Sequence, residues 1–423
     1  MKPNRFLLSI LAVLLGLPVS AIAQQPLTWQ QLKARFAAAN PQLKAGSLSV
    51  DEMKAAEITA SLRPNPQLSV TSDGTQIARH NGIWQPLSGT DMQSSVSYLH
   101  ERDRKRELRQ QSAREGTQIA AAQQADLERN LLFNLRTLFV SALEAKEILR
   151  LAEADLAYYD HIIEIGRDRL RAGDLAQIDL DRIELERVAY ESELEQARVN
   201  LRTAKIQLLQ QLDERMPVDQ FDVTGNFDFD ASLHSLDEYR QQALVQRPDL
   251  RAAIESIQQA ETNHKLAVAN GSTDPTFSSF YTWNASNNNS NAQQTLGVGV
   301  SVPLRIFDRN QGEKQRALID IGRNQQLSAA ARAQVFSDVD SAYAQVESTL
   351  ALLKPYKAHY NAQSLRVRDT VTYSYQHGGA SLMDFLNAQS SYRQVQLAYV
   401  QLIGAYLTAN GQLDLATGNE VLP

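Results

Sequence analysis

The stretch that decides the fold is the run from Arg104 to Arg171, RKRELRQQSAREGTQIAAAQQADLERNLLFNLRTLFVSALEAKEILRLAEADLAYYDHIIEIGRDRLR. It is rich in Ala, Leu, Glu, Gln and Arg, and no proline occurs from Leu87 to Met216, so little opposes helix formation. A helix of 68 residues is about 100 Å long. Because a globular domain is much narrower than this, the sequence predicts a rod and not a compact enzyme.

The rod is predicted to fold back on itself between Leu170 and Gln177. The returning segment carries mostly apolar residues at alternating steps of three and four, which is the spacing of a coiled-coil seam. The seam positions are Leu180, Ile183, Arg187, Tyr190, Leu194, Ala197, Leu201, Ala204, Leu208 and Gln211. This segment therefore predicts a long helical hairpin.

The same hairpin is encoded a second time, 205 residues later. The turn sequence GDLAQID at 173–179 corresponds to GGASLMD at 378–384. The second seam is again almost wholly apolar: Phe385, Ala388, Tyr392, Val395, Tyr399, Leu402, Tyr406, Ala409, Leu413 and Ala416. The chain is therefore expected to contain two structural repeats.

Each repeat begins with two shorter helices, and the second of them starts at a proline. The first repeat predicts Leu27–Ala39 and then Pro41 to about Leu62, and the second predicts Leu236–Gln246 and then Pro248 to about Ala269. Two strands follow in each repeat, and the clearest one alternates apolar with small polar residues. The predicted strands are Gln67–Thr71, Met92–Leu99, Thr276–Trp283 and Thr295–Val302.

Four strands are too few to close a membrane barrel, and open sheet edges are not tolerated in hydrocarbon. Either the sheet is soluble, or three copies of the chain close one barrel of twelve strands, with twelve helical columns beneath it. Pro41–Leu62 and Ala176–Leu212, stacked end to end, nearly match the long helix. We expect the connector 213–235 and the C-terminal tail to form a belt at mid-length, where Pro355 would kink or break the second long helix.

The N-terminus has the pattern of an export signal. Lys2 and Arg5 precede the apolar segment Phe6–Leu17, and Ala21-Ile22-Ala23 is a cleavage site. Cysteine is absent from the sequence, which excludes disulfides and thiolate sites. The net charge of −6 argues against nucleic acid as a partner. We divide the chain into a signal peptide (1–23), repeat one (24–212), the connector (213–235) and repeat two (236–423).

These features together resemble the TolC family of outer-membrane efflux proteins. The resemblance is carried by the duplication, by NPQLKA (40–45) and RPDLRA (247–252), and by the two tip turns. In addition, PLRIFDRNQG (303–312) is similar to the start of the second long helix in cobalt, zinc and cadmium efflux channels. The corresponding segment of repeat one in those channels commonly contains a glycine, which HERDRKR (100–106) lacks. The residues of this metal-subgroup motif are Pro303, Leu304, Phe307, Asp308, Arg309, Asn310, Gln311 and Gly312.

The resemblance implies a mainly α-helical homotrimer with a small β part. A twelve-stranded β-barrel would lie in outer-membrane lipid and continue as an α-helical barrel across the periplasm. The channel would need no cofactor, and it would work with a periplasmic adaptor and a proton-driven inner-membrane pump. Divalent heavy-metal cations are the first interpretation of its cargo, with drugs or other small molecules as the alternative. A structural periplasmic coiled-coil protein is a second alternative.

The resemblance also implies roles at the tips. Asp384 matches the first of two aspartates that ring the narrowest point of such channels, but Asn387 occupies the second position. Asp179 is its counterpart in repeat one. A carboxylate in the first turn of a helix also caps the helix, and Ser381 with Asp384 has the spacing of a capping box. The adaptor is expected to dock at the tip glycines, which are Gly173, Gly378 and Gly379.

Motifs for catalysis are absent from the sequence. There is no P-loop, no nucleophile elbow and no H-E-x-x-H, and no pair among the seven histidines has the spacing of a metal site on a helix. We therefore expect no catalytic residue and no metal held by the protein.

Overall fold

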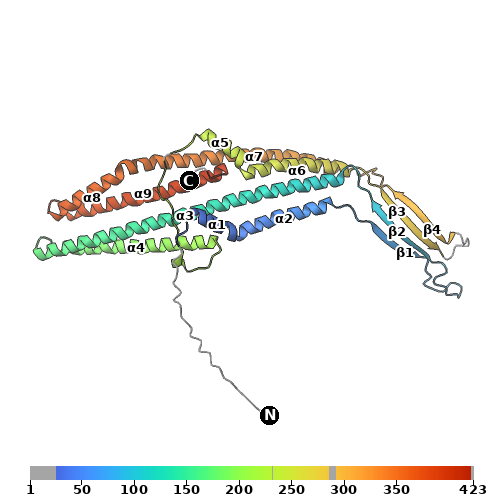
Figure 1. The fold of residues 1–423 in the computed structure, drawn as a ribbon, viewed down its shortest axis with the longest axis horizontal. Helices are drawn as coiled ribbons and strands as arrows, with labels where there is room; N and C mark the ends of the chain where they lie inside the picture. The colour runs from blue at the N-terminus through green and yellow to red at the C-terminus, as the bar shows by residue number, and fades with distance from the viewer. Residues whose placement is uncertain (1–24, 231, 285–291, 421–423) are drawn as a thin grey trace, which may run out of the picture.

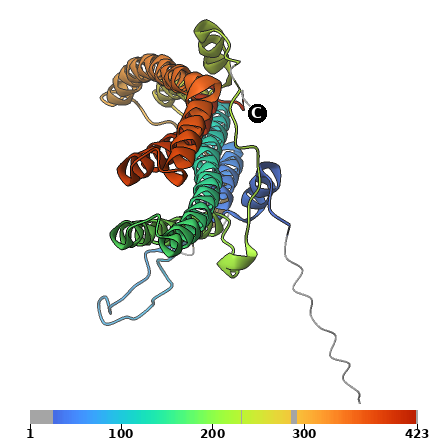
Figure 2. The ribbon, with the colours of Figure 1, turned by 90° about the vertical axis from the view of Figure 1, so that its left-hand side faces the viewer.

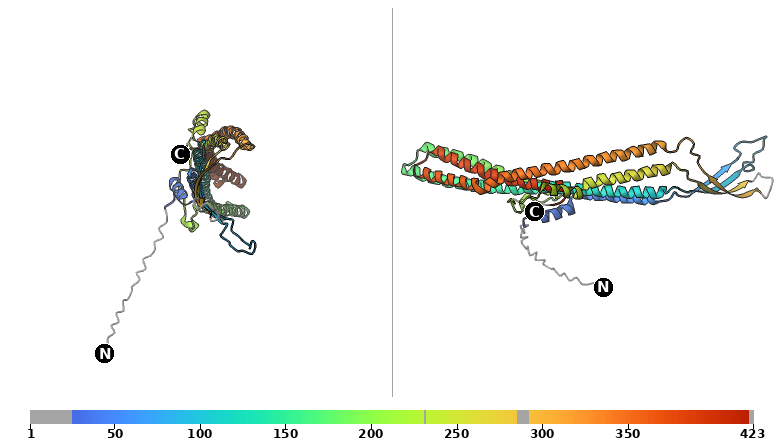
Figure 3. Two further views of the ribbon diagram at one scale, coloured as in Figure 1. Left: turned by 90° about the vertical axis from the view of Figure 1, so that its right-hand side faces the viewer. Right: turned by 90° about the horizontal axis from the view of Figure 1, so that it is seen from above.

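The computed structural model describes residues 25–230, 232–284 and 292–420, which form a long rod with a small sheet at one end (Figures 1 and 3). The predicted signal peptide lies outside the described residues. In chain order the elements are α1 (Trp29–Ala39), α2 (Pro41–Ser61), β1 (Gln67–Asp73), β2 (Asp91–Leu99), α3 (Lys105–Ala172), α4 (Gln177–Gln211), η1 (Val218–Gln220), α5 (Leu236–Gln246), α6 (Pro248–Asn270), β3 (Thr276–Asn284), β4 (Gln294–Ser301), α7 (Gln311–Pro355), η3 (Tyr356–Tyr360), α8 (Asn361–Gln376) and α9 (Leu382–Thr417).

The helix α3 has the predicted length of 68 residues, and α4 returns along it to form the first hairpin. The second hairpin consists of α7, η3 and α8 on the way out and α9 on the way back. The elements of the first hairpin recur in the second, so the predicted duplication and the mainly helical fold class are confirmed.

The four strands form one antiparallel sheet in the order β1-β2-β3-β4. Its register separates the side chains by face, because successive residues of a strand point to opposite sides. One face carries Leu68, Val70, Met92, Val96, Tyr98, Phe277, Tyr281, Trp283, Leu296, Val298 and Val300. The other face is mostly Gln, Ser, Thr and Gly, with Phe280 covering Gly297 as its large exception. The sheet therefore has one apolar and one small polar face.

The helices form four parallel columns in the described part of the chain. Helix α3 packs against α2 and α4 on one side and against α6 and α9 on the other, while α7 and α8 flank α6 and α9. Seen end-on in Figure 2, the columns make a curved layer with α1 on one side of it. The two outermost columns, α2 with α4 and α7 with α8, are the free edges of this layer.

Two of the columns are built from helices that meet end to end, as predicted for the first. The side-chain amide of Asn40, the N-cap of α2, donates to the carbonyl of Gln211 at the end of α4 (3.2 Å). In the second repeat, Arg247 precedes α6 and donates to the carbonyl of Ala416 near the end of α9 (3.3 Å). The two repeats therefore make the same junction with different side chains.

A belt lies against the rod at mid-length, where these junctions lie. Two buried clusters meet there, one around Phe36, Leu135 and Phe221 and the other around Tyr239 and Leu353. The connector contributes to the belt as predicted, but α1 and α5 contribute more than the C-terminal tail, whose Glu420 pairs with Lys33 (2.7 Å). Amphipathic helices can bury more apolar surface than the described tail residues 418–420.

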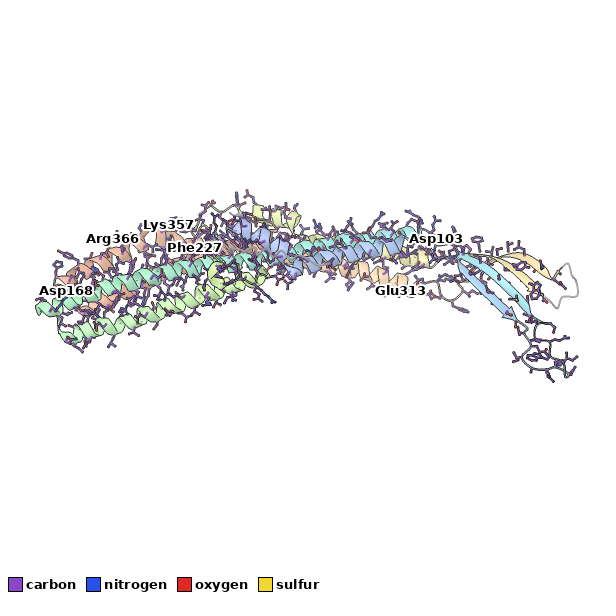
Figure 4. All side chains as sticks on the ribbon, turned by 60° about the horizontal axis from the view of Figure 1, so that its bottom comes forward. Asp103, Asp168, Phe227, Glu313, Lys357 and Arg366 are labelled. Carbon is purple, nitrogen blue, oxygen red and sulfur yellow. The ribbon has the colours of Figure 1, made fainter. Side chains whose placement is uncertain are left out.

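Pro355 interrupts the second long helix without breaking it. The chain continues from Pro355 into the π-helical segment η3 and then into α8. A proline removes one backbone donor and its ring crowds the preceding turn, which a wider turn relieves. Lys357 pairs with Asp228 of the connector (3.2 Å) and lies over the ring of Phe229 (4.8 Å), so the interruption is at the belt, as predicted (Figure 4).

Within the described residues, no helix combines the length and the apolar character needed to cross a membrane.

The two end-to-end junctions differ in how much they should contribute to stability. Arg247 is 4% exposed and pairs with Asp249 (2.6 Å) and Asp338 (2.8 Å). We expect Arg247→Ala to lower the free energy of unfolding by about 2–4 kcal/mol, because it removes a buried side chain that pairs with two half-buried carboxylates. Asn40→Ala should cost about 1–2 kcal/mol, the usual effect of a lost N-cap.

Chemical unfolding of the detergent-solubilised protein measures both values. Arg171→Ala is the control, since Arg171 is 78% exposed and pairs only with Asp168, one turn away. A cost for Arg247→Ala no larger than that of the control would contradict the assigned role.

Candidate functional site: the helical tips

The two tip turns have the same backbone structure. Gly173 and Gly378 both adopt left-handed conformations, with φ of +83° and +75°. In each turn the glycine N–H donates three residues back and the next N–H donates five residues back, from Gly173 and Asp174 in one turn and from Gly378 and Gly379 in the other. This is the Schellman arrangement, in which glycine provides the left-handed residue that ends the helix.

The tip glycines are open to solvent. A Cβ atom added at Gly173 or Gly378 would meet no other atom within 4 Å. Asp168, near the end of α3, lies at the end of the rod that is farthest from the sheet (Figure 4). The tips therefore present an exposed surface made of two similar turns.

Arg169 joins the two turns. Its guanidinium donates to the backbone carbonyl of Tyr375 (3.0 Å) and lies over the ring of that residue, 5.2 Å from the ring centre. It also donates to the carbonyl of Asp174 (3.3 Å) in its own turn. Tyr375 in turn stacks on Phe385 at the start of α9. Arg169 thus links the hairpin ends, which also share a buried apolar cluster.

Asp384 forms the predicted capping box at the start of α9. The Ser381 hydroxyl and backbone N–H donate to its carboxylate (2.7 and 3.1 Å), and the Asp384 N–H donates to the Ser381 hydroxyl oxygen (3.1 Å). These hydrogen bonds from Ser381 lower the pKa of Asp384. Asp384 is exposed and therefore carries a full negative charge at neutral pH.

Asn387 is exposed one turn beyond Asp384, while Phe385 and Ala388 between and after them are buried in the seam. Residues three apart on a helix share a face. The structure thus brings Asp384 and Asn387 together on the free face of α9, away from the packed seam.

Asp179 has a different environment from its counterpart Asp384. It lies in the first turn of α4 and is half-buried, and Arg182 is 3.8 Å away. No side chain makes a capping hydrogen bond at the start of α4. The predicted capping role therefore holds for Asp384, whereas Asp179 is paired with an arginine because the residue at its N-cap position is Ala176.

The metal-subgroup motif forms the link between β4 and α7. Its polar residues shape the loop: Asp308 accepts from the Asn310 N–H (2.8 Å), and the Gln311 side chain bonds both Phe307 and Arg309. Asn310 adopts a left-handed conformation and donates to the Ala267 carbonyl (2.7 Å). Arg104 has the same conformation before α3, so the two repeats share this junction despite their different sequences. Leu304 and Phe307 remain exposed.

A cluster that the sequence did not predict joins the hairpins between belt and tips. The Arg368 guanidinium lies between the rings of Tyr158 (4.8 Å) and Tyr392 (4.2 Å). Arg393 lies over Tyr190 (4.9 Å) and pairs with Glu193 (2.9 Å). The sequence contains arginines and seam tyrosines that could form such contacts. Only the tertiary packing shows that the arginines and tyrosines meet across the two hairpins.

Asp155 of α3 faces this cluster. Burial raises the pKa of Asp155 to about 6, although Arg393 and Arg368 act in the opposite direction, and Glu193 raises it further. The Asp155 carboxylate therefore lies between the hairpins and is partly shielded from water. The effect of this burial on the pKa is larger than the opposite effect of the two arginines.

Metal-binding geometry is not found at the tips. In residues 25–230, 232–284 and 292–420, no three histidine, aspartate or glutamate side chains are grouped so that they could hold a metal ion.

The chain is similar to known outer-membrane proteins. Residues 239–419 match the model of the outer membrane efflux protein family. The chain is 23% identical to the cobalt-zinc-cadmium resistance protein CzcC of Cupriavidus metallidurans, over 94% of this chain and 91% of that protein. It is also 23% identical to the outer membrane efflux protein BepC of Brucella suis, over 69% of this chain and 64% of that protein.

Solved structures share the fold over nearly the whole chain. CusC, which forms a transmembrane channel, superposes with a TM-score of 0.78 at 19% identity and 92% coverage of both chains. The outer membrane protein VceC of Vibrio cholerae superposes with a TM-score of 0.74 at 15% identity, over 92% of this chain and 96% of that chain. The fold class expected from the sequence is thereby confirmed.

Protonation of Asp155 should stabilise the contact between the hairpins. An acid whose pKa is higher in the folded than in the unfolded state favours folding as the pH falls. Between pH 7.5 and 5, we expect the free energy of unfolding to rise by about 1–2 kcal/mol through this group, after allowance for its partial exposure. Asp155→Asn should remove this part of the pH dependence and increase stability at pH 7.5.

Urea unfolding at the two pH values measures the effect. Asp168→Asn is the matched control, because Asp168 lies on the same helix and is 69% exposed. If both variants keep the pH dependence of the original protein, the role given to Asp155 is wrong.

Proposed function

We propose that the chain, whose residues 239–419 match the outer membrane efflux protein family, is the passive exit duct of a tripartite efflux system driven by an inner-membrane proton-coupled pump. In this proposal it is an outer-membrane channel that extends into the periplasm and has no catalytic role. Energy would therefore be supplied by a partner, and the role of this chain would be to provide the path.

The observation that carries the proposal is the pair of free edges. Within the described residues, β1 and β4 each pair on one side only. The columns formed by α2 with α4 and by α7 with α8 likewise pack on one side only. Three copies joined edge to edge would pair both sets of edges at once, giving a twelve-stranded barrel with its apolar face toward lipid and twelve helical columns beneath it.

The exposed tips support docking of a periplasmic adaptor. Gly173, Gly378 and Gly379 lie in two turns of the same backbone geometry, so a repeated adaptor element could bind each turn in the same way. Arg169 links the turns and would transmit a displacement of one to the other. In this proposal the tips move apart when the adaptor binds.

Divalent heavy-metal cations are the proposed cargo. CzcC is a cobalt-zinc-cadmium resistance protein, and this chain is similar to it over nearly its whole length. The ionised Asp384 at the tips would place one negative charge per chain near the narrow end. Efflux of drugs or other small molecules through the same fold is the second candidate, favoured by the relative BepC, an outer membrane efflux protein.

The carboxylate at the tips should set ion selectivity. We expect Asp384→Asn to lower the cation-to-anion permeability ratio several-fold in planar bilayers, because a trimer would lose all three charges of the ring. Asn387→Asp should raise the ratio above that of the original protein. Reversal potentials in a salt gradient measure both.

Asp168→Asn provides the matched control, since Asp168 is an exposed tip carboxylate paired with Arg171. Equal changes of permeability in the Asp168 and Asp384 variants would mean that general surface charge, and not Asp384, controls the pore.

Loss of the gene should sensitise cells to metals. We expect deletion to lower the tolerated concentration of zinc, cadmium or cobalt, because the duct would no longer carry these ions out of the periplasm. Growth inhibition is measured for these metals, for nickel and copper, and for unrelated drugs. Sensitivity to drugs with unchanged metal tolerance would refute the metal cargo and favour the second candidate.

A further inference from the structure

A cavity of about 300 Å³ lies at mid-length over the groove between α3 and α9, beneath the connector. It is separate from the tips and from the sheet. Aromatic side chains form much of its wall: Trp29, Phe139, Phe229 and Tyr406. Because α3 and α9 are central columns, the cavity is far from the edges at which copies of the chain would join. It lies on the side of the layer that carries α1 (Figure 2).

One polar side chain of the cavity wall has an unused acceptor. Asn410 is 3% exposed and lines the cavity, and its carboxamide oxygen has no hydrogen-bond partner among the residues that the structure describes. Leaving a buried acceptor unpaired is unfavourable. A molecule that fills the cavity and donates a hydrogen bond would remove this penalty.

The charged side chains near the cavity already have partners. Arg136 pairs with Asp414 (2.5 Å) and lies over the Trp29 ring (5.9 Å), and Asp228 pairs with Lys357 (3.2 Å). The acceptor of Asn410 therefore decides which ligand fits. It favours a group that donates an N–H over an anionic group that can only accept.

We propose that this cavity, called here the equatorial cavity, binds a compact aromatic amine. The ring of the ligand would lie among Trp29, Phe139 and Tyr406, and its N–H group would donate to the carboxamide of Asn410. A volume of about 300 Å³ is at the lower end of the range typical of small-molecule sites. The inference does not depend on the cargo of the channel.

Calorimetric titration of the purified full-length protein tests the proposal. The probes are 1-naphthylmethylamine, which carries a protonated donor, and 1-naphthylacetate, which has the same ring with an anionic acceptor. We expect the amine to bind at least about tenfold more tightly. Asn410→Leu, which keeps the volume but removes the acceptor, should weaken amine binding about tenfold and should leave the melting temperature unchanged or higher.

A second variant keeps the test decisive if Asn410→Leu folds poorly. Leu407→Trp fills the cavity and should abolish binding, whereas Leu397→Trp, on the same helix but outside the cavity wall, should not affect it. Equal binding of the amine and the acetate would overturn the proposal. Unchanged amine affinity in the Asn410 variant would also overturn it. A lower melting temperature of this variant would do the same, because it would indicate that a buried water already donates to the carboxamide.

Bilayer conductance separates this inference from the proposed channel function. The Asn410 and Leu407 variants should conduct as the original protein does, because the equatorial cavity lies outside the tip constriction. A change in conductance of these variants that equals the change caused by Asp384→Asn would contradict the independence of the two sites.

Discussion

The hydrogen-bonding edges of the sheet are the constraint on which the rest of this structure depends. In hydrocarbon an unpaired backbone N–H or C=O costs several kcal/mol, so a membrane strand must have a partner on both sides. Within the described residues the chain has four strands, and β1 and β4 each lack one neighbour. The helical layer has the same property, since its edge columns also pack on one side only. In the proposed trimer the same neighbouring copies would pair both sets of edges, which links the sheet to the rod.

The two helices that form the first column are together shorter than the single long helix beside them, and they meet at the belt. Helices α2 and α4, with 21 and 35 residues, are together shorter than α3 with 68. The ends of the shorter helices leave orphan backbone groups. At the first junction, the neutral side chain of Asn40 donates to a backbone carbonyl. At the second, the buried Arg247 donates to a backbone carbonyl and also pairs with two aspartates. At the belt the two repeats therefore form the same junction with side chains of different charge.

The elements that follow from local sequence were predicted closely, because periodicity and proline position determine them. The 68-residue helix, the four strands and the capping box of Ser381 belong to this group. The π-helical turn after Pro355 and the pairing of Asp179 with Arg182 depend on how strain and charge are relieved in the folded chain. The cluster around Asp155 and Arg368 requires knowledge of which hairpin faces which, and no pattern along the chain contains that information.

The difference between Asp179 and Asp384 bears on how a duct could favour cations without holding them. The two positions follow tip turns of the same geometry, but Asp179 lies 3.8 Å from Arg182, and the residue three positions after Asp384 is Asn387. In the proposed trimer Asp384 would contribute three charges near the narrow end. A conduit needs sites that attract an ion but release it readily, and a ring of few, solvated carboxylates meets both conditions better than a closed ligand shell. The hydrogen bonds from Ser381 keep Asp384 ionised, so attraction would persist in an acidified periplasm.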